Sequence, residues 1–125
     1  MFTVGIDSIE IERVKKSLRS KRFIDYVYGK NELTEMKEKG FPAQTAAASF
    51  AVKEAFGKAL GTGIRGFKLC EVELLHNSFG GPVVQLSGSA EKIADERSLV
   101  IKASITHTKT TATAIVIAYK RGNVL

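Results

Sequence analysis

Apolar and polar residues alternate at the very start of the chain. Phe2, Val4 and Ile6 alternate with small or polar residues, and Asp7 is the last residue of this pattern. A period of two is typical of a strand with one buried face. The pattern therefore predicts that the three apolar side chains face the core, and that Asp7 ends the strand on its other face.

The spacing of apolar residues then lengthens to that of a helix. Ile11, Val14 and Leu18 recur at helical intervals, which predicts a short amphipathic helix directly after the strand. Ser8 precedes this pattern and is available as its N-cap. Residues 19–41 are more polar, and their scattered apolar positions indicate shorter helices.

An alanine-rich helix is predicted for the middle of the chain. Pro42 is suited to its first turn, the pattern ends near Leu60, and Gly61 is its expected terminator. Glu54 and Lys58 are four residues apart and share one face of this helix. A different face forms the expected core stripe, which consists of Val52, Ala55, Phe56 and Ala59.

The second half of the chain indicates strands. Residues 70–88 contain two apolar runs around a Gly-Gly turn, residues 90–98 suit a short helix, and residues 100–120 resemble a second hairpin ending in a strand over Thr111–Tyr119. These elements predict the α+β class. We expect one small domain over residues 1–125, with an antiparallel sheet packed on the long helix.

Composition limits the classes of function. A chain of 125 residues with 44% hydrophobic residues fits one globular domain with a modest core. Its net charge of +6 favours polyanionic partners, but the basic residues are spread along the chain without the aromatic interleaving of a single-strand binder. The lone Cys70 and the absence of an apolar run of about 18 residues lead us to expect a cytoplasmic protein with no membrane span.

Two carboxylates are candidates for a metal site. Asp7 at a strand end and Glu54 on the helix could converge on Mg²⁺, which typically takes one or two carboxylates and keeps its other positions for water and phosphate oxygens. A structural interpretation competes with this one. Glu54 and Lys58 have the spacing of a helix-surface ion pair, and Asp7 could cap the following helix. From these residues alone, both interpretations stay open.

Other reactive residues give weaker signals. His107 lies among hydroxyl groups at a strand end, where an imidazole could donate to phosphate or transfer a proton, or could simply be exposed on a hairpin. The Gly-Thr-Gly at 61–63 suits a helix C-cap as well as a phosphate loop. His76 has no titratable neighbour along its strand and is interpreted as structural. The histidines and Cys70 lack the spacing of zinc ligands.

Four segments together resemble one family. They are GIDSIEIERV at 5–14, KRF at 21–23, FAVKEAFGKALGTG at 50–63 and SITHTKTTATA at 104–114. In order and spacing they resemble the holo-[acyl-carrier-protein] synthases, the short bacterial 4′-phosphopantetheinyl transferases. The resemblance implies that the chain transfers phosphopantetheine from coenzyme A to a serine of apo acyl carrier protein, leaving adenosine 3′,5′-bisphosphate, in support of fatty acid biosynthesis. It also implies the fold of these transferases and a homotrimer with each active site at a subunit interface.

The resemblance also implies roles for individual residues. Asp7 and Glu54 would bind Mg²⁺ against the coenzyme A pyrophosphate, Lys58 would neutralise phosphate charge, and Arg13 would meet the acidic carrier protein. Lys53 belongs to the same segment without a clear role. Residues implied to line the coenzyme A site are Lys58, Gly61, Thr62, Gly63, Ser104, Thr106, His107 and Thr108.

Some questions stay open within this resemblance. Glu54, His107 or a water on the metal could take the proton of the attacking serine. Ser49 stands where relatives often have Arg, which puts one cofactor or subunit contact in question. Two other classes compete: a basic nucleic-acid-binding module, which gives Asp7 and Glu54 no task, and a non-catalytic adaptor that binds acyl carrier protein without turnover.

Overall fold

The computed structural model describes residues 1–122. This part of the chain contains a three-stranded sheet, a separate β-hairpin and five α-helices. The elements in chain order are β1 (Phe2–Glu10), α1 (Ile11–Ser17), α2 (Lys21–Val27), α3 (Lys30–Glu38), α4 (Ala43–Leu60), the 3₁₀-helix η1 (Leu69–Glu71), β2 (Val72–His76), β3 (Pro82–Leu86), α5 (Gly88–Glu96), β4 (Leu99–His107) and β5 (Thr111–Lys120). Within the described residues, no helix is long and apolar enough to cross a membrane.

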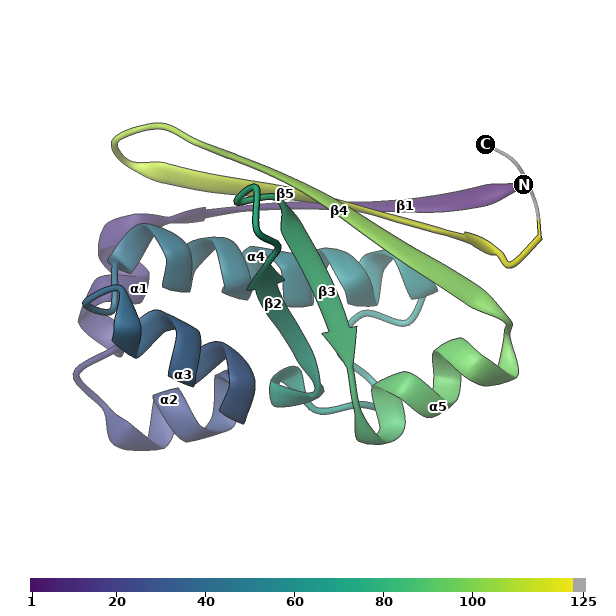
Figure 1. The fold of residues 1–125 in the computed structure, drawn as a ribbon, viewed down its shortest axis with the longest axis horizontal. Helices are drawn as coiled ribbons and strands as arrows, with labels where there is room; N and C mark the ends of the chain where they lie inside the picture. The colour runs from purple at the N-terminus through teal and green to yellow at the C-terminus, as the bar shows by residue number, and fades with distance from the viewer. Residues whose placement is uncertain (123–125) are drawn as a thin grey trace.

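The large sheet has the strand order β1-β5-β4, and both pairings are antiparallel. Strands from the two ends of the chain therefore lie side by side, with β5 in the centre. The long helix α4 runs along one face of this sheet (Figure 1). On the far side of α4 lie the β2–β3 hairpin and the short helices, so that α4 is enclosed. The predicted α+β class, both hairpins and the helix before β4 are confirmed.

Helix α4 begins and ends as its sequence predicts. Pro42 is the N-cap, and Gly61 is the C-cap in the left-handed conformation, with φ of 83°. Glycine adopts that conformation without the steric cost that a side chain would add. Both predicted ends of the helix are thus confirmed.

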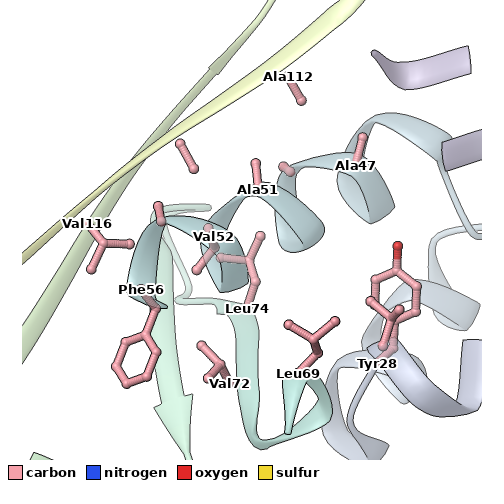
Figure 2. Packing of buried hydrophobic residues seen from close by; sticks show 14 of the residues in the cluster. Tyr28, Ala47, Ala51, Val52, Phe56, Leu69, Val72, Leu74, Ala112 and Val116 are labelled. Atoms are coloured by element: carbon pink, nitrogen blue, oxygen red, sulfur yellow. The ribbon is translucent and has the colours of Figure 1, made fainter. Parts of the chain in front are cut away.

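The hydrophobic core surrounds α4. The predicted stripe is buried, and Phe56 packs edge to face on Phe67 with 5.1 Å between ring centroids. Figure 2 shows α4 between the sheet and the hairpin, with Val116 of β5 on one side and Leu69, Val72 and Leu74 on the other. The face of α4 toward the sheet carries alanines, and the facing residues of β5 are also small. Helix and sheet can therefore approach each other closely. Those residues of β5 are Ala112, Ala114 and Ala118.

The prediction for the faces of β1 is wrong. Phe2, Val4 and Ile6 are 51%, 46% and 57% exposed, whereas Gly5 is buried against α4 and Asp7 lies on the same face as Gly5. Alternation predicts a strand with two different faces but cannot say which face meets the helix. Here α4 comes so close that only the face with Gly5 fits, and the apolar face is left open.

Two local predictions also need correction. The strand does not end at Asp7 but continues to Glu10, and helix α1 begins at Ile11 with Glu10 as its N-cap. Ser8 is therefore not a cap, and its hydroxyl is hydrogen-bonded across the sheet to that of Thr113 at 2.7 Å. The strand extends because its pairing with β5 continues to Glu10, which lies opposite Thr111.

Candidate active site

A cavity of about 470 Å³ lies where β1, α1 and α4 meet. Asp7 contributes from β1, Arg13 from α1, and Glu54 and Lys58 from α4. These four predicted site residues, separated by up to 51 positions in the sequence, thus line one concave surface. The remaining lining residues are Ser8, Ile9, Glu10, Val14, Ser17, Phe23 and Phe50.

Lys58 connects the strand to the helix within this cavity. Its ammonium donates to the carbonyl oxygen of Ile6 at 2.9 Å and to Asp7 Oδ1 at 3.2 Å. The Asp7 side chain is 18% exposed and that of Lys58 is 52% exposed, so the pair is open to solvent. A half-exposed pair of this kind adds only about 0–1 kcal/mol to stability. Its location in the cavity is therefore more informative than its contribution to folding.

Glu54 lines the same cavity as Asp7, and the charge of Asp7 acts on it. Partial burial raises the pKa of Glu54, the negative charge of Asp7 raises it further, and Lys58 acts in the opposite direction. A carboxylate whose charge is disfavoured by a second carboxylate in the same cavity is stabilised by a cation. Carboxylates are hard oxygen donors, and two of them suit Mg²⁺. The donor set of Asp7 and Glu54 therefore fits the ion that the sequence implied. Among residues 1–122, no group of three or more His, Cys, Asp or Glu side chains forms a larger candidate site.

Two aromatic residues of the cavity were missed by the sequence analysis. Phe23 of α2 and Phe50 of α4 are stacked, with centroids 6.1 Å apart and an interplanar angle of 13°. A signal existed for Phe50, because it precedes Glu54 by four residues and Lys58 by eight and so shares their face of the helix. Phe23 comes from another element, and only the packing of α2 on α4 brings it here.

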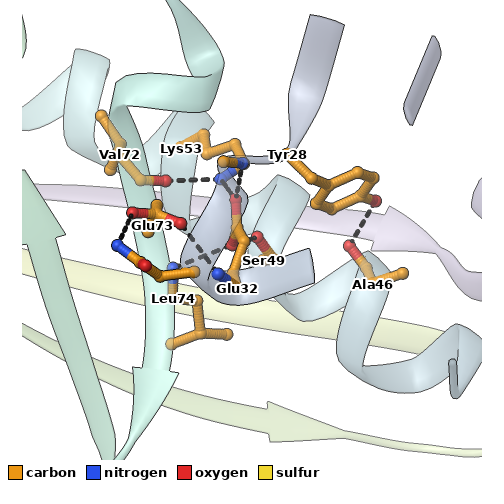
Figure 3. A network of polar contacts seen from close by, with 10 residues as sticks. Tyr28, Glu32, Ala46, Ser49, Lys53, Val72, Glu73 and Leu74 are labelled. Atoms are coloured by element: carbon orange, nitrogen blue, oxygen red, sulfur yellow. Dashed lines mark hydrogen bonds and ion pairs between the residues drawn. The ribbon is translucent and has the colours of Figure 1, made fainter. Parts of the chain in front are cut away.

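Lys53, next to Glu54 in the chain, points to a different environment. Its side chain is completely buried, and its ammonium donates to Glu32 Oε1 at 2.6 Å and to the carbonyl of Val72. Burial lowers the pKa of Lys53, and the charge of Glu32 opposes that shift. Figure 3 shows this pair between α3, α4 and β2. Lys53 is therefore part of the interior and does not line the cavity.

Glu32 is the centre of this buried polar cluster. Its Oε1 also accepts from the amide of Gly29, and its Oε2 accepts from the Ser49 hydroxyl at 2.6 Å and from the amide of Leu74 at 2.9 Å (Figure 3). Glu73 accepts from the amide of Glu32 at 2.8 Å. Within the described residues, no buried side-chain nitrogen or oxygen lacks a partner. Ser49, whose role the sequence left open, is thus a buried partner of Glu32.

His107 lies apart from the carboxylates. It lines a second cavity, of about 290 Å³, together with Gln44, Thr45 and His76. The interpretation of His76 as lacking a titratable neighbour is wrong, because its Nδ1 lies 3.1 Å from Glu35 Oε2. That neighbour comes from α3, which the sequence of the strand cannot reveal.

The predicted site residues of β4, His107 included, lie on both faces of the sheet. Side chains alternate along a strand, so Ser104 and Thr106 face away from α4 while His107 faces the opposite side. Thr108 belongs to the turn, where its hydroxyl oxygen accepts from the amides of Thr110 and Thr111. This segment therefore does not form one surface within a single chain.

The Gly-Thr-Gly segment closes helix α4. The amides of Thr62 and Gly63 both donate to the carbonyl of Gly57, at 3.3 and 3.0 Å. These two N–H groups are occupied by the helix end, as in a C-cap. A role in cofactor binding, which stays a prediction, would have to use the exposed surface of the loop and not these amides.

Comparisons with known proteins agree on one family. The sequence profile of the 4′-phosphopantetheinyl transferase superfamily matches residues 3–116. A holo-[acyl-carrier-protein] synthase of Caldanaerobacter subterraneus subsp. tengcongensis is 40% identical over 117 residues, which cover 92% of each chain. One of Clostridium botulinum is also 40% identical, over 91% of this chain and 94% of its own.

Solved structures of such synthases have the same fold. The enzyme of Neisseria meningitidis superposes with a TM-score of 0.86 at 29% identity, covering 94% of this chain and 98% of the other. The enzyme of Bacillus anthracis, in complex with CoA (3′,5′-ADP), superposes with a TM-score of 0.77 at 29% identity, covering 94% and 96%. The similarity therefore extends over nearly the whole chain in sequence and in structure.

Proposed function

The chain belongs to the 4′-phosphopantetheinyl transferase superfamily, and on that basis we propose that it acts as a holo-[acyl-carrier-protein] synthase. It transfers 4′-phosphopantetheine from coenzyme A to a serine of apo acyl carrier protein and releases adenosine 3′,5′-bisphosphate. The observation that carries this proposal is the cavity in which Asp7, Glu54 and Lys58 converge. The product supports fatty acid biosynthesis, and the lone cysteine suits a cytoplasmic enzyme.

Asp7 and Glu54 are the residues that would hold Mg²⁺. Their carboxylates line the same cavity from β1 and α4, and the pKa of Glu54 is raised in part by the charge of Asp7. When bound, Mg²⁺ would supply positive charge to the pyrophosphate of coenzyme A. Two protein carboxylates leave the remaining positions of the ion for water and phosphate oxygens, as such a reaction requires.

Lys58 provides the second positive charge of the site. Its ammonium lies 3.2 Å from Asp7 Oδ1 and is half exposed, so it can reach a phosphate oxygen of a substrate in the cavity. Phosphoryl transfer depends mainly on positioning and on stabilising charge, which a lysine at this place provides. For the proton of the attacking serine, Glu54 or a water on the metal is favoured over His107, because Glu54 lines this cavity and His107 lines the other.

His107 joins the site, in this proposal, from a neighbouring subunit. His107 and the carboxylates line different cavities, so one chain does not bring them together. The open face of β1 offers an apolar surface through Phe2, Val4 and Ile6, each at least 46% exposed. The register extends it onto β5 and β4, where Tyr119, Ile117, Ile115, Ser104 and Thr106 lie on the same face. An apolar sheet face of this kind is typical of a subunit interface.

The homotrimer is tested by light scattering during size-exclusion chromatography. We expect a mass of three copies, and we expect Ile6→Asp to dissociate the assembly and to abolish transfer, because a charge would be buried at the contact. When Ile6→Asp is mixed with the wild-type chain, the variant should not join assemblies of three copies. A monomeric wild-type chain with full activity would contradict the shared site.

Arg13 is proposed to meet the carrier protein. It lies on α1 at the edge of the cavity, so an acidic carrier docked there would bring its serine toward Asp7. Attraction between opposite charges mainly speeds association and weakens with salt. We expect Arg13→Glu to raise the KM for apo carrier protein and to flatten its salt dependence, with little change in the KM for coenzyme A. An equal loss for both substrates would assign Arg13 to the coenzyme A site.

One experiment tests the function directly. Apo acyl carrier protein is incubated with the chain, coenzyme A and Mg²⁺, and its mass is followed together with release of adenosine bisphosphate. We expect the carrier to gain one phosphopantetheine group, and to gain none when the metal is chelated. Binding of the carrier without a mass change would favour the adaptor interpretation. Nucleic-acid binding without turnover of coenzyme A would favour a basic binding module.

A further inference from the structure

Gly5 is the point at which β1 comes closest to α4. A Cβ atom built on Gly5 would lie 1.9 Å from the carbonyl oxygen of Ala55 and 2.7 Å from the amide nitrogen of Ala59. These two backbone groups are four residues apart and belong to one turn of the helix. Gly5 has no positive φ that would itself require glycine. A residue without a side chain is therefore needed at position 5 only because the strand lies directly on the helix backbone.

This contact lies beside the proposed metal site. Gly5 and Asp7 are two residues apart, so both face α4. On the helix, Ala55 and Ala59 form one ridge, and Glu54 and Lys58 form the adjacent one. The strand thus meets the first ridge at Gly5 and the second at Asp7, where Lys58 lies 3.2 Å from the carboxylate.

We propose that Gly5 is a positioning residue that sets the separation of the two metal-binding carboxylates. The inference rests on the proposed function, because it takes Asp7 and Glu54 as the ligands of Mg²⁺. One carboxylate is fixed to β1 and the other to α4, so the distance between strand and helix decides whether both reach one ion. Gly5 makes no contact with the ion or with substrate.

The size of the expected displacement follows from the contact. Cβ atoms essentially never come closer than 3.0 Å to a backbone atom, and the added atom would lie at 1.9 Å. A methyl group would therefore move β1 away from α4 by about 1 Å at this point. Mg²⁺ requires ligand distances close to about 2.1 Å in near-octahedral geometry, so a shift of that size weakens shared coordination.

The test is direct metal binding to the assembled protein. Mn²⁺ serves as a paramagnetic probe, and its free concentration is measured by electron paramagnetic resonance, with Mg²⁺ as competitor. We expect Gly5→Ala to weaken Mn²⁺ binding about tenfold, the scale at which residues that orient ligands affect metal affinity. Unchanged affinity in a folded Gly5→Ala protein would overturn the proposal.

Gly57→Ala is the matched control. Its Cβ would lie 2.5 Å from the carbonyl oxygen of Gly63, so it also forces a backbone apart from α4, but at the loop and not at β1. We expect it to alter the binding of coenzyme A and to leave Mn²⁺ affinity unchanged. An equal loss of Mn²⁺ affinity in both variants would assign the effect to general disturbance of α4 and would overturn a specific role of Gly5.

A rescue variant separates positioning from stability. Asp7→Glu adds about one methylene of reach, so we expect it to weaken Mn²⁺ binding alone but to restore part of it in the Gly5→Ala background. A general loss of stability would not be repaired by a longer carboxylate, so absence of rescue counts against the proposal. If Gly5→Ala does not fold, Ala59→Val is the second variant, because it adds bulk at a buried residue of the helix turn whose backbone meets Gly5. Unchanged Mn²⁺ affinity in Ala59→Val would then overturn it.

The outcome for the wild-type chain distinguishes the two proposals. If the wild-type chain transfers phosphopantetheine and binds Mn²⁺, but Gly5→Ala binds Mn²⁺ equally well, only the role of Gly5 fails. If the wild-type chain binds no Mn²⁺ and transfers nothing, the proposed function fails with it.

Discussion

Lys53 and Glu54 are neighbours in the chain but belong to opposite kinds of environment. Lys53 is fully buried and pairs with Glu32, whereas Glu54 lines an open cavity beside Asp7 and Lys58. Successive residues of a helix point about 100° apart, so two adjacent charges can serve an interior and a site. One turn of α4 therefore carries both a structural charge and a candidate functional one.

The difference lies in how each charge is satisfied. Glu32 and Lys53 have partners fixed by the fold, including the amides of Gly29 and Leu74. Around Glu54 the pKa is raised, and Lys58 is half exposed, so those charges are incompletely balanced by the protein itself. A satisfied buried cluster stabilises one fold, whereas an unbalanced exposed one is typical of a site that awaits a ligand.

The largest expected effect comes from breaking the buried pair. Lys53→Met keeps the length of the side chain but leaves Glu32 as a buried charge with neutral donors only. Removing one partner of a buried ion pair costs about 3–5 kcal/mol. We expect a loss of that size in the free energy of unfolding, measured by urea denaturation at fixed protein concentration. A loss below about 1 kcal/mol would contradict the structural role assigned to this buried pair.

Glu54→Gln should lower the transfer rate and not the stability, the opposite of Lys53→Met. The change keeps the shape of the side chain and removes its charge, so we expect the transfer rate to fall at least about 100-fold, or about 2.7 kcal/mol. Stability should be unchanged or slightly higher, because a raised pKa means that the folded state disfavours the charge of Glu54. Steady-state rates and thermal midpoints of the same preparation check both parts. Near-normal turnover would contradict the metal assignment.

Lys58→Ala is expected to lower transfer about tenfold, through the loss of one charge near the phosphates. Lys58→Ala should lower the free energy of unfolding by no more than an exposed ion pair contributes, about 0–1 kcal/mol. Lys21→Ala is the control for stability, because it removes the exposed pair with Asp25 at 2.7 Å outside the cavity. Unchanged transfer together with a small loss of stability would reduce Lys58 to a surface ion pair.

The smallest effect is expected for Ser49→Ala. It removes the hydroxyl that donates to Glu32 Oε2, which keeps its bond from the amide of Leu74, so we expect a loss of about 1 kcal/mol in stability. The transfer rate should be unchanged, since Ser49 does not line the cavity. Thr34→Ala, at an exposed hydroxyl on α3 bonded to the carbonyl of Lys30, is the control and should cost less. A selective loss of activity would assign Ser49 a role in the site.

The sequence by itself determined the local elements and the shared face of Glu54 and Lys58. Helix α4 was predictable at both ends because proline fixes its own φ, as at Pro42, whereas glycine adopts the left-handed conformation that ends a helix, as at Gly61. The faces of that helix were predictable because its period is fixed. The four family segments indicated the family, and the site residues that this resemblance implies stay a prediction.

The tertiary structure decided which faces meet. Alternation in β1 predicted two faces, but the close approach at Gly5 turned Asp7 toward α4 and left Phe2, Val4 and Ile6 open. The partner of Lys53 is Glu32, 21 positions away in the sequence. This pairing depends on the packing of α3 against α4, so the sequence did not predict it either. Periodicity is a property of consecutive residues, whereas contacts across elements depend on how closely two backbones can approach, and only the folded chain fixes that distance.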